Sequence, residues 1–191
     1  TGAGSNQWRN GVMWKSPTII QATTNKTLSV SNSILVGTGA GAYLFGNKEV
    51  PGDFNLTWDA KPSTTYQSFS AFQNAGLGLG WTWSLYADPL FANATNGDFH
   101  VRSAAGRYDT NLLDYATVDT NYSPAIDLGD PLAAFGLEPL PNGSRLNAGL
   151  YGNTAQASKS NTNLWLQVMS YMDGGTLNAP VGSWLRWNGG G

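Results

Sequence analysis

Short runs of alternating apolar and polar residues dominate the first half of the chain, and Gly, Asn or Pro-Gly closes each run. A period of two is typical of β-strands that bury one face. In the stretch 27–31, Leu28 and Val30 should point inward and the intervening serines outward. The pattern predicts short strands with frequent corners at residues 17–21, 27–31, 33–36, 42–45 and 54–58.

A helical period is nearly absent, with one exception between Ser63 and Ala75. There Tyr66, Phe69 and Phe72 recur at a spacing of three. Residues at that spacing share one face of a helix. The sequence therefore predicts one short helix whose apolar side faces the core.

Many short strands can build a sandwich, a closed barrel or a parallel solenoid, and hairpin signals separate these architectures. The Asn-Gly pairs that begin at positions 10, 96 and 142 lack matched alternating arms on both sides. Solenoid coils bury their core by stacking, so they need only short strands and corners. The sequence favours an all-β solenoid with parallel coils over residues 12–101.

An ordered series of motifs runs from about Trp81 to Ser160: ADPLF at 87–91, NGDFH at 96–100, SPAIDLGDP at 123–131 and RLNAGLYGNT at 145–154. Their order and spacing resemble the C-terminal part of bacterial right-handed parallel β-helix repeat proteins, the pectate-lyase-like solenoids of secreted and surface proteins. The resemblance implies β-helix coils with a closing cap over residues 1–157. It also implies an extracellular or cell-surface location, with preceding coils or another protein chain as a neighbour.

The composition changes after residue 157. Residues 158–163 read as a polar linker, and 164–191 contain alternating apolar residues that predict a short β segment. This segment resembles the opening strands of an Ig-like module, which needs about 100 residues to complete. We therefore expect Trp165, Trp184 and Trp187 to pack on the solenoid or on another chain, and the sequence to be a fragment of a larger protein.

Composition narrows the classes of function. Aromatic residues reach 12% and the formal net charge is −2, which is untypical of disorder. Apolar runs fall short of the roughly 20 residues of a membrane span, and the scattered charges offer no basic stripe for nucleic acid. The chain has no cysteine and a single His100, so thiolate zinc sites and histidine cages are excluded.

Almost all candidate acidic residues lie beside Pro, Gly or Asn, in turns where an aspartate side chain commonly forms hydrogen bonds with the backbone. They are Asp88, Asp98, Asp109, Asp114, Asp119, Asp127 and Asp130. We therefore expect no catalytic residue in this chain. Asp98 and His100 could form a dyad, although a surface histidine beside a turn is favoured. Asp127 and Asp130 could share a Ca²⁺ ion with backbone carbonyls, although a structural corner is favoured.

The densest aromatic group comprises Trp58, Tyr66, Trp81, Trp83 and Tyr86. Exposed aromatic rings on a β-helix can stack on sugar rings, so these five residues are the candidate carbohydrate-binding set. The alternative is that some of them, such as Trp81 and Trp83, pack beneath the expected helix.

These observations predict a non-catalytic structural or adhesive part of a large extracellular bacterial protein, with polysaccharide as its ligand. Two alternatives remain. The chain could be a fragment of a polysaccharide lyase or glycoside hydrolase whose active site lies in preceding coils. It could also be an accessory subunit of an extracellular filament or larger complex.

Overall fold

The computed structural model describes residues 5–21, 27–46 and 48–161. The segment expected at 164–191, including its three tryptophans, lies outside the described residues, as do residues 162 and 163 of the expected linker. The described chain is mostly β, which confirms the all-β class. All five strands expected in the first half form, within one or two residues of the predicted bounds.

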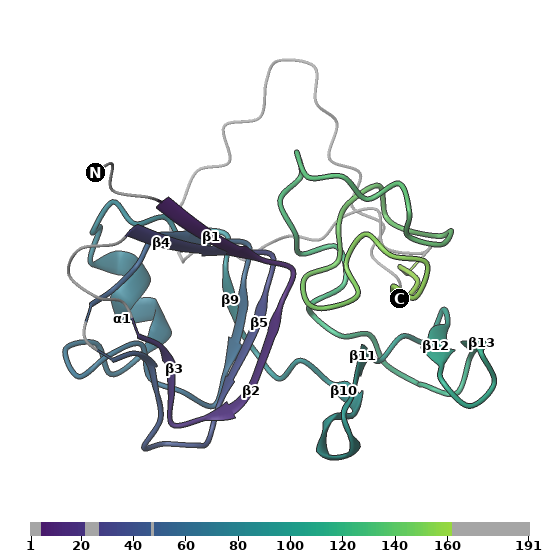
Figure 1. Cartoon of the computed structure of the whole chain (residues 1–191), viewed down its shortest axis with the longest axis horizontal. Coiled ribbons are helices and arrows are strands. Elements are labelled where there is room, and N and C mark those ends of the chain that lie inside the picture. Colours follow the sequence, from purple (N-terminus) through teal and green to yellow (C-terminus); the bar gives the residue numbers. More distant parts are fainter. Residues whose placement is uncertain (1–4, 22–26, 47, 162–191) are drawn as a thin grey trace, which may run out of the picture.

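In the described part of the first half, nine strands belong to three small sheets whose pairings are all parallel. In chain order they are β1 (Ser5–Arg9), β2 (Val12–Ser16), β3 (Thr18–Ile20), β4 (Thr27–Ser31), β5 (Ile34–Gly37), β6 (Tyr43–Phe45), β7 (Gly52–Asp53), β8 (Leu56–Trp58) and β9 (Leu85–Tyr86). The sheets have the orders β1-β4-β7, β2-β5-β8-β9 and β3-β6. They surround a common interior (Figure 1).

The chain retraces its course at a regular step. Val12 pairs with Ile34, and Ile34 pairs with Leu56. We call the three successive passes rung 1 (5–20), rung 2 (27–45) and rung 3 (52–61). Single bridges from Tyr43 to Lys61 and from Gly52 to Gly80 extend the same parallel stacking beyond the named strands.

A ladder of buried hydrogen bonds links equivalent corners of the rungs. The Gly11 N–H donates to Ser33 Oγ, and the Ser33 N–H donates to Asn55 Oδ1, each across 22 residues. The Asn55 N–H in turn donates to Ser84 Oγ. The residue before each of the first three corners, Asn10, Asn32 and Phe54, has a positive φ of 50° to 56°. The ladder therefore satisfies the backbone at sharp turns that water does not reach.

The interior of the rungs holds one hydrophobic core. Leu35, Leu44 and Phe45 from rung 2 pack there with Trp81. The predicted helix is confirmed but shorter: α1 spans Phe69–Asn74, and Ser68 Oγ caps it by accepting from the Ala71 N–H. Its apolar side faces this core through Phe69 and Phe72, whereas Tyr66 precedes the helix and packs against the core as a half-buried side chain.

A second core lies on the other face of the sheet β2-β5-β8-β9. Ile34, Val36 and Leu56 point to that face, where Leu128 and Ala148 cover them. Strand β5 is consequently buried on both faces. Ala148, which belongs to the motif at 145–154, thus contacts a face of this sheet.

The second half contains antiparallel pairs, so the prediction of parallel coils through residue 101 is wrong beyond Tyr86. These strands are β10 (Phe91–Asn93), β11 (Asp98–Val101), β12 (Arg107–Asp109) and β13 (Asp114–Ala116), with a 3-10 turn η1 (Ala94–Asn96) between the first two. Gly97 adopts φ 82° after η1 and lets the chain reverse. The Asn-Gly pair at 96 therefore does mark a hairpin, with arms too short to show alternation.

Residues 158–160 of the expected linker are packed rather than solvated. Ser158 and Ser160 are both buried. Ser158 Oγ donates to the Val101 carbonyl, and Ser103 Oγ donates to the Lys159 carbonyl. Among the described residues, no helix is long and apolar enough to cross a membrane.

Candidate functional site

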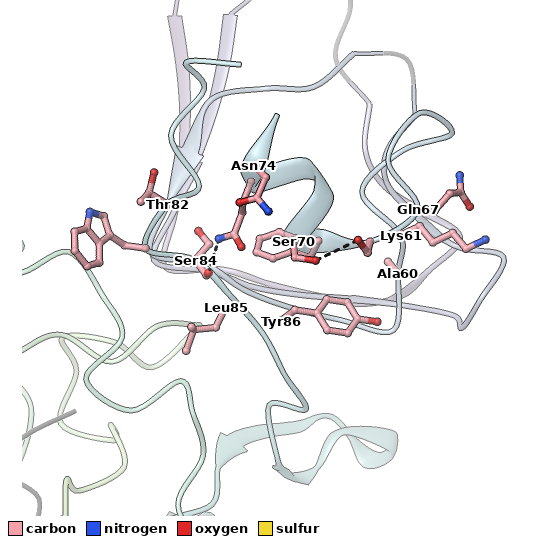
Figure 2. Close-up of a pocket in the computed structure, with 13 residues that line it drawn as sticks. Ala60, Lys61, Gln67, Ser70, Asn74, Thr82, Ser84, Leu85 and Tyr86 are labelled. Atoms are coloured by element: carbon pink, nitrogen blue, oxygen red, sulfur yellow. Dashed lines mark hydrogen bonds between the residues drawn. The ribbon is translucent and has the colours of Figure 1, made fainter. Parts of the chain in front are cut away.

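A groove of about 700 Å³ lies between α1 and residues 82–86, and we call it the helix groove. Two aromatic side chains on its wall are well exposed, Trp83 at 45% and Tyr86 at 46%. The lining also includes side chains that can donate hydrogen bonds, among them Lys61, Gln67, Ser70, Asn74, Thr82 and Ser84. Figure 2 shows Asn74 and Ser84 toward one end of the groove, and Lys61, Gln67 and Tyr86 toward the other.

Hydrogen bonds to the backbone hold the wall of the helix groove in place. Gln73 Nε2 donates to the carbonyls of Trp81 at 2.6 Å and Ser84 at 3.0 Å. Asp53 Oδ1 accepts from the Trp83 N–H at 2.7 Å. Burial raises the pKa of Asp53, and bonds from backbone N–H groups oppose this shift. The wall that presents Trp83 is thus tied both to α1 and to rung 3.

The five candidate aromatic residues divide between groove and core. Tyr86 lines the helix groove, with its ring centroid 5.2 Å from that of half-buried Trp58 and 6.2 Å from that of Phe69. Trp83 also lines the groove, so it does not pack beneath the helix. Trp81 is fully buried beside α1, which corrects its assignment to a binding surface. The ring centroid of Tyr66 lies 5.5 Å from that of Phe72.

A second groove of about 380 Å³ lies between the strand ends of the first half and the β10–β11 hairpin, and we call it the hairpin groove. Trp14 and Trp58 form its aromatic wall. The Trp14 ring makes edge contacts with the rings of Phe91 and Phe99, whose centroids lie 5.5 Å and 6.3 Å from its own. Sequence reasoning missed this groove because Trp14 and Phe91 are far apart in the chain.

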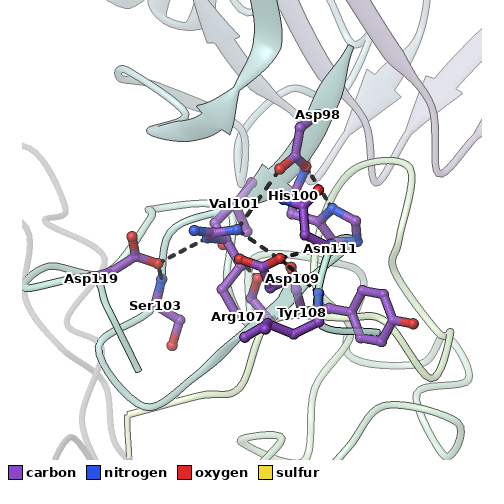
Figure 3. A network of polar contacts seen from close by, with 11 residues as sticks. Asp98, His100, Val101, Ser103, Arg107, Tyr108, Asp109, Asn111 and Asp119 are labelled. Atoms are coloured by element: carbon purple, nitrogen blue, oxygen red, sulfur yellow. Dashed lines mark hydrogen bonds and ion pairs between the residues drawn. The ribbon is translucent and has the colours of Figure 1, made fainter. Parts of the chain in front are cut away.

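His100 is buried at 1% exposure, so its expected place on the surface is wrong. Its Nδ1 lies 2.6 Å from Asp98 Oδ1, and its ring stacks on Tyr151 at 3.7 Å. Figure 3 shows the Arg107 guanidinium between Asp98 and Asp119, with its Nε donating to Asp119 Oδ2 at 3.1 Å. These contacts join β11 and β12 to Tyr151 in the motif at 145–154, and none of these residues lines the helix groove or the hairpin groove.

Several of the candidate aspartates bond turn backbone as expected. The carboxylates of Asp88 and Asp130 each accept from the N–H two residues onward, and Asp109 accepts from the N–H groups of Asn111 and Leu112. Asp127 instead accepts from Ser160 Oγ at 2.8 Å. No group of three or more His, Cys, Asp or Glu side chains that could hold a metal ion occurs in the part of the chain that the structure describes.

Sequence reasoning missed a buried polar network around Asn147 because its members are dispersed in the chain. The Asn147 N–H donates to Glu138 Oε1, the Asn147 Oδ1 accepts from the Asp127 N–H, and its Nδ2 donates to the Ser158 carbonyl. Burial raises the pKa of Glu138 to about 7 and that of Asp127 to about 6. Each carboxyl group therefore stays protonated in the folded chain up to a higher pH than an exposed carboxyl group would.

This network predicts that stability decreases as pH rises across the acidic range. A carboxyl group with a raised folded pKa contributes most below its unfolded pKa, near 4.5 for glutamate, and its contribution is lost as pH rises through the folded value of about 7. Urea unfolding between pH 4 and pH 8 should show this decrease. Glu138→Gln should flatten it, because the substituted side chain carries no proton to lose. An unchanged slope in that variant would contradict the assignment to Glu138.

Comparisons with known proteins return no match among protein-family models, curated proteins or solved structures.

Proposed function

We propose that the chain is part of a right-handed parallel β-helix and that its helix groove binds carbohydrate, in a non-catalytic structural or adhesive role outside a bacterial cell. The β-helix is supported by the parallel register of the three rungs and by the hydrogen-bond ladder at their corners. The handedness and the location rest on the motif resemblance.

The helix groove is the observation that carries the carbohydrate proposal. A pyranose ring has apolar C–H faces and a rim of hydroxyl groups, so it is complementary to aromatic rings flanked by amide and hydroxyl side chains. Trp83 and Tyr86 supply such rings at the surface, and Gln67, Asn74 and Thr82 supply exposed polar groups beside them. Of the described residues that line the groove, Lys61 alone is charged, which suits a ligand recognised through hydroxyl groups.

The open edge of rung 1 supports the proposed neighbours of this chain. Among the described residues, β1, β2 and β3 each pair with another strand on one side only. Unpaired strand edges readily accept further strands. Preceding β-helix coils, or another protein chain in a larger complex, would pair there.

Substitutions in the helix groove test the carbohydrate proposal. Binding of the whole chain to an array of neutral and acidic polysaccharides would identify ligands, and calorimetry would measure the Kd. Trp83→Ala and Tyr86→Ala should each raise the Kd at least tenfold, because truncation of an aromatic anchor removes more than about 1.4 kcal/mol of binding.

The matched control is Leu132→Ala, which truncates a highly exposed side chain outside the groove and should leave the Kd unchanged. Thermal unfolding should show that both groove variants remain folded. Absence of binding across the array, or binding that survives the double variant, would refute the proposal. Shortened oligosaccharides after incubation would favour the alternative of an enzyme.

A further inference from the structure

The helix groove and the hairpin groove are lined by neighbouring residues of the same two stretches of chain. Along the chain from 58 to 61, Trp58 and Asp59 line the hairpin groove, and Ala60 and Lys61 line the helix groove. A second stretch also passes from one groove to the other: residues 82–86 line the helix groove, and Asp88 lines the hairpin groove. At the junction, the rings of Tyr86 and Trp58 lie 5.2 Å apart.

The backbone around the hairpin groove is strained. Lys15 and Leu90 have φ values of 50° and 52°, a region that disfavours residues other than glycine, and both line this groove. Lys15 also lies where the register of β2 against β5 shifts between Met13 and Ser16. Strain and bulges concentrate where a site needs a side chain aimed in a particular direction. Here the irregular strand carries the Trp14 and Lys15 side chains of the groove wall.

We propose that the two grooves are subsites of one extended site for an uncharged polysaccharide that runs from the helix groove across Tyr86 and Trp58 into the hairpin groove. This inference rests on the proposed carbohydrate binding in the helix groove. The continuous walls and the touching rings of the junction provide the path. Trp14 and Trp58 supply apolar surface for further sugar rings.

The described residues of the two linings together carry three cations and two carboxylates, so their charges nearly cancel, which favours an uncharged chain over a polyanion. In the hairpin groove, two cations are balanced by two carboxylates: Lys15, Arg102, Asp59 and Asp88. A uronic acid polymer would place its negative charges beside Asp59 and Asp88, where like charges repel. Hydroxyl groups of a neutral chain can hydrogen-bond to all four side chains.

Isothermal calorimetry with cello-oligosaccharides of increasing length, and with oligogalacturonates of equal length, tests this inference. The wild-type chain should bind the shortest cello-oligosaccharides through the helix groove, and the longer ones at least tenfold more tightly. The blocking variant Thr95→Trp, at an exposed position in the hairpin groove lining, should lose the gain with length and keep the affinity for short oligosaccharides. Thr120→Trp, at an exposed position outside both linings, should behave as wild type.

Three results would overturn the inference while leaving carbohydrate binding in the helix groove intact. They are equal affinity for short and long cello-oligosaccharides, a gain with length that survives Thr95→Trp, and tighter binding of oligogalacturonates than of cello-oligosaccharides. If neither series binds, the extended site is refuted, and the polysaccharide array decides separately whether the helix groove binds carbohydrate.

Discussion

Trp81→Ala should lower the free energy of unfolding by about 3–5 kcal/mol, the usual cost of removing a large buried aromatic side chain. Trp81 is fully buried, and its ring makes edge contacts with Phe45 at 5.5 Å and with Phe69 and Phe72 of α1. Its indole Nε1 also donates to the Val50 carbonyl at 2.8 Å. The substitution thus removes packing between rungs and helix and leaves a buried carbonyl without its donor.

Urea unfolding followed by circular dichroism measures this loss, and two further variants resolve its cause. Trp81→Phe keeps most of the apolar surface but not the hydrogen bond, so it should cost about 1–3 kcal/mol. Trp83→Ala removes an exposed tryptophan two residues away and should change stability by no more than about 0.5 kcal/mol. Equal costs for Trp81→Ala and Trp83→Ala would contradict the division of these tryptophans between core and groove.

The alternation of apolar and polar residues predicts the strands of the first half well, because one face of each strand points into the interior of the rungs and the other points outward. Leu28 and Val30 both belong to the interior core, as the pattern of stretch 27–31 predicts. The rule fails at β5, where Ile34 and Val36 are buried opposite Leu35. A second layer covers that face, and a local pattern carries no information about a segment about 100 residues further along.

The repeat of the rungs is hard to recognise in the sequence, because equivalent positions carry different residue types that make the same kind of hydrogen bond. Gly11, Ser33, Asn55 and Ser84 occupy successive steps of the corner ladder. Three of them supply a side-chain acceptor for the N–H of the preceding step, which hydroxyl and amide groups can do equally well. A search for small residues at a step of 22 would have shown the first three positions.

The candidate site was partly predictable. The density of aromatic residues between 58 and 86 pointed to the correct stretch, since Trp83 and Tyr86 line the helix groove. Residue type alone could not separate them from Trp81, which α1 and rung 2 bury. The hairpin groove depends on the packing of the β10–β11 hairpin against the strand ends, a contact that no local pattern specifies.

The other large effect is expected from Asn55, which occupies the middle of the corner ladder and is fully buried. Its Oδ1 accepts from the Ser33 N–H at 3.1 Å, and its Nδ2 donates to the Val30 carbonyl at 2.9 Å. Asn55→Ala leaves both groups of rung 2 without this partner, and each buried unsatisfied group costs about 1–3 kcal/mol. We expect a loss of about 2–5 kcal/mol in urea unfolding, and faster hydrogen exchange at the Ser33 amide.

A second substitution at this position distinguishes the ladder from simple loss of packing. Asn55→Asp preserves the acceptor for the Ser33 N–H and nearly the same volume, but it replaces the amide donor to the Val30 carbonyl with a buried carboxyl group, which can donate there only when it is protonated. Burial raises the pKa of such a group, so its protonated form is favoured in the folded chain. Asn55→Asp should therefore be less destabilising at pH 4 than at pH 7, whereas the cost of Asn55→Ala should be independent of pH.

Exposed Asn121 provides the control, because Asn121→Ala should leave stability within about 0.5 kcal/mol of wild type. If Asn55→Ala cost no more than this control, the ladder could not be what fixes the register between rungs 2 and 3.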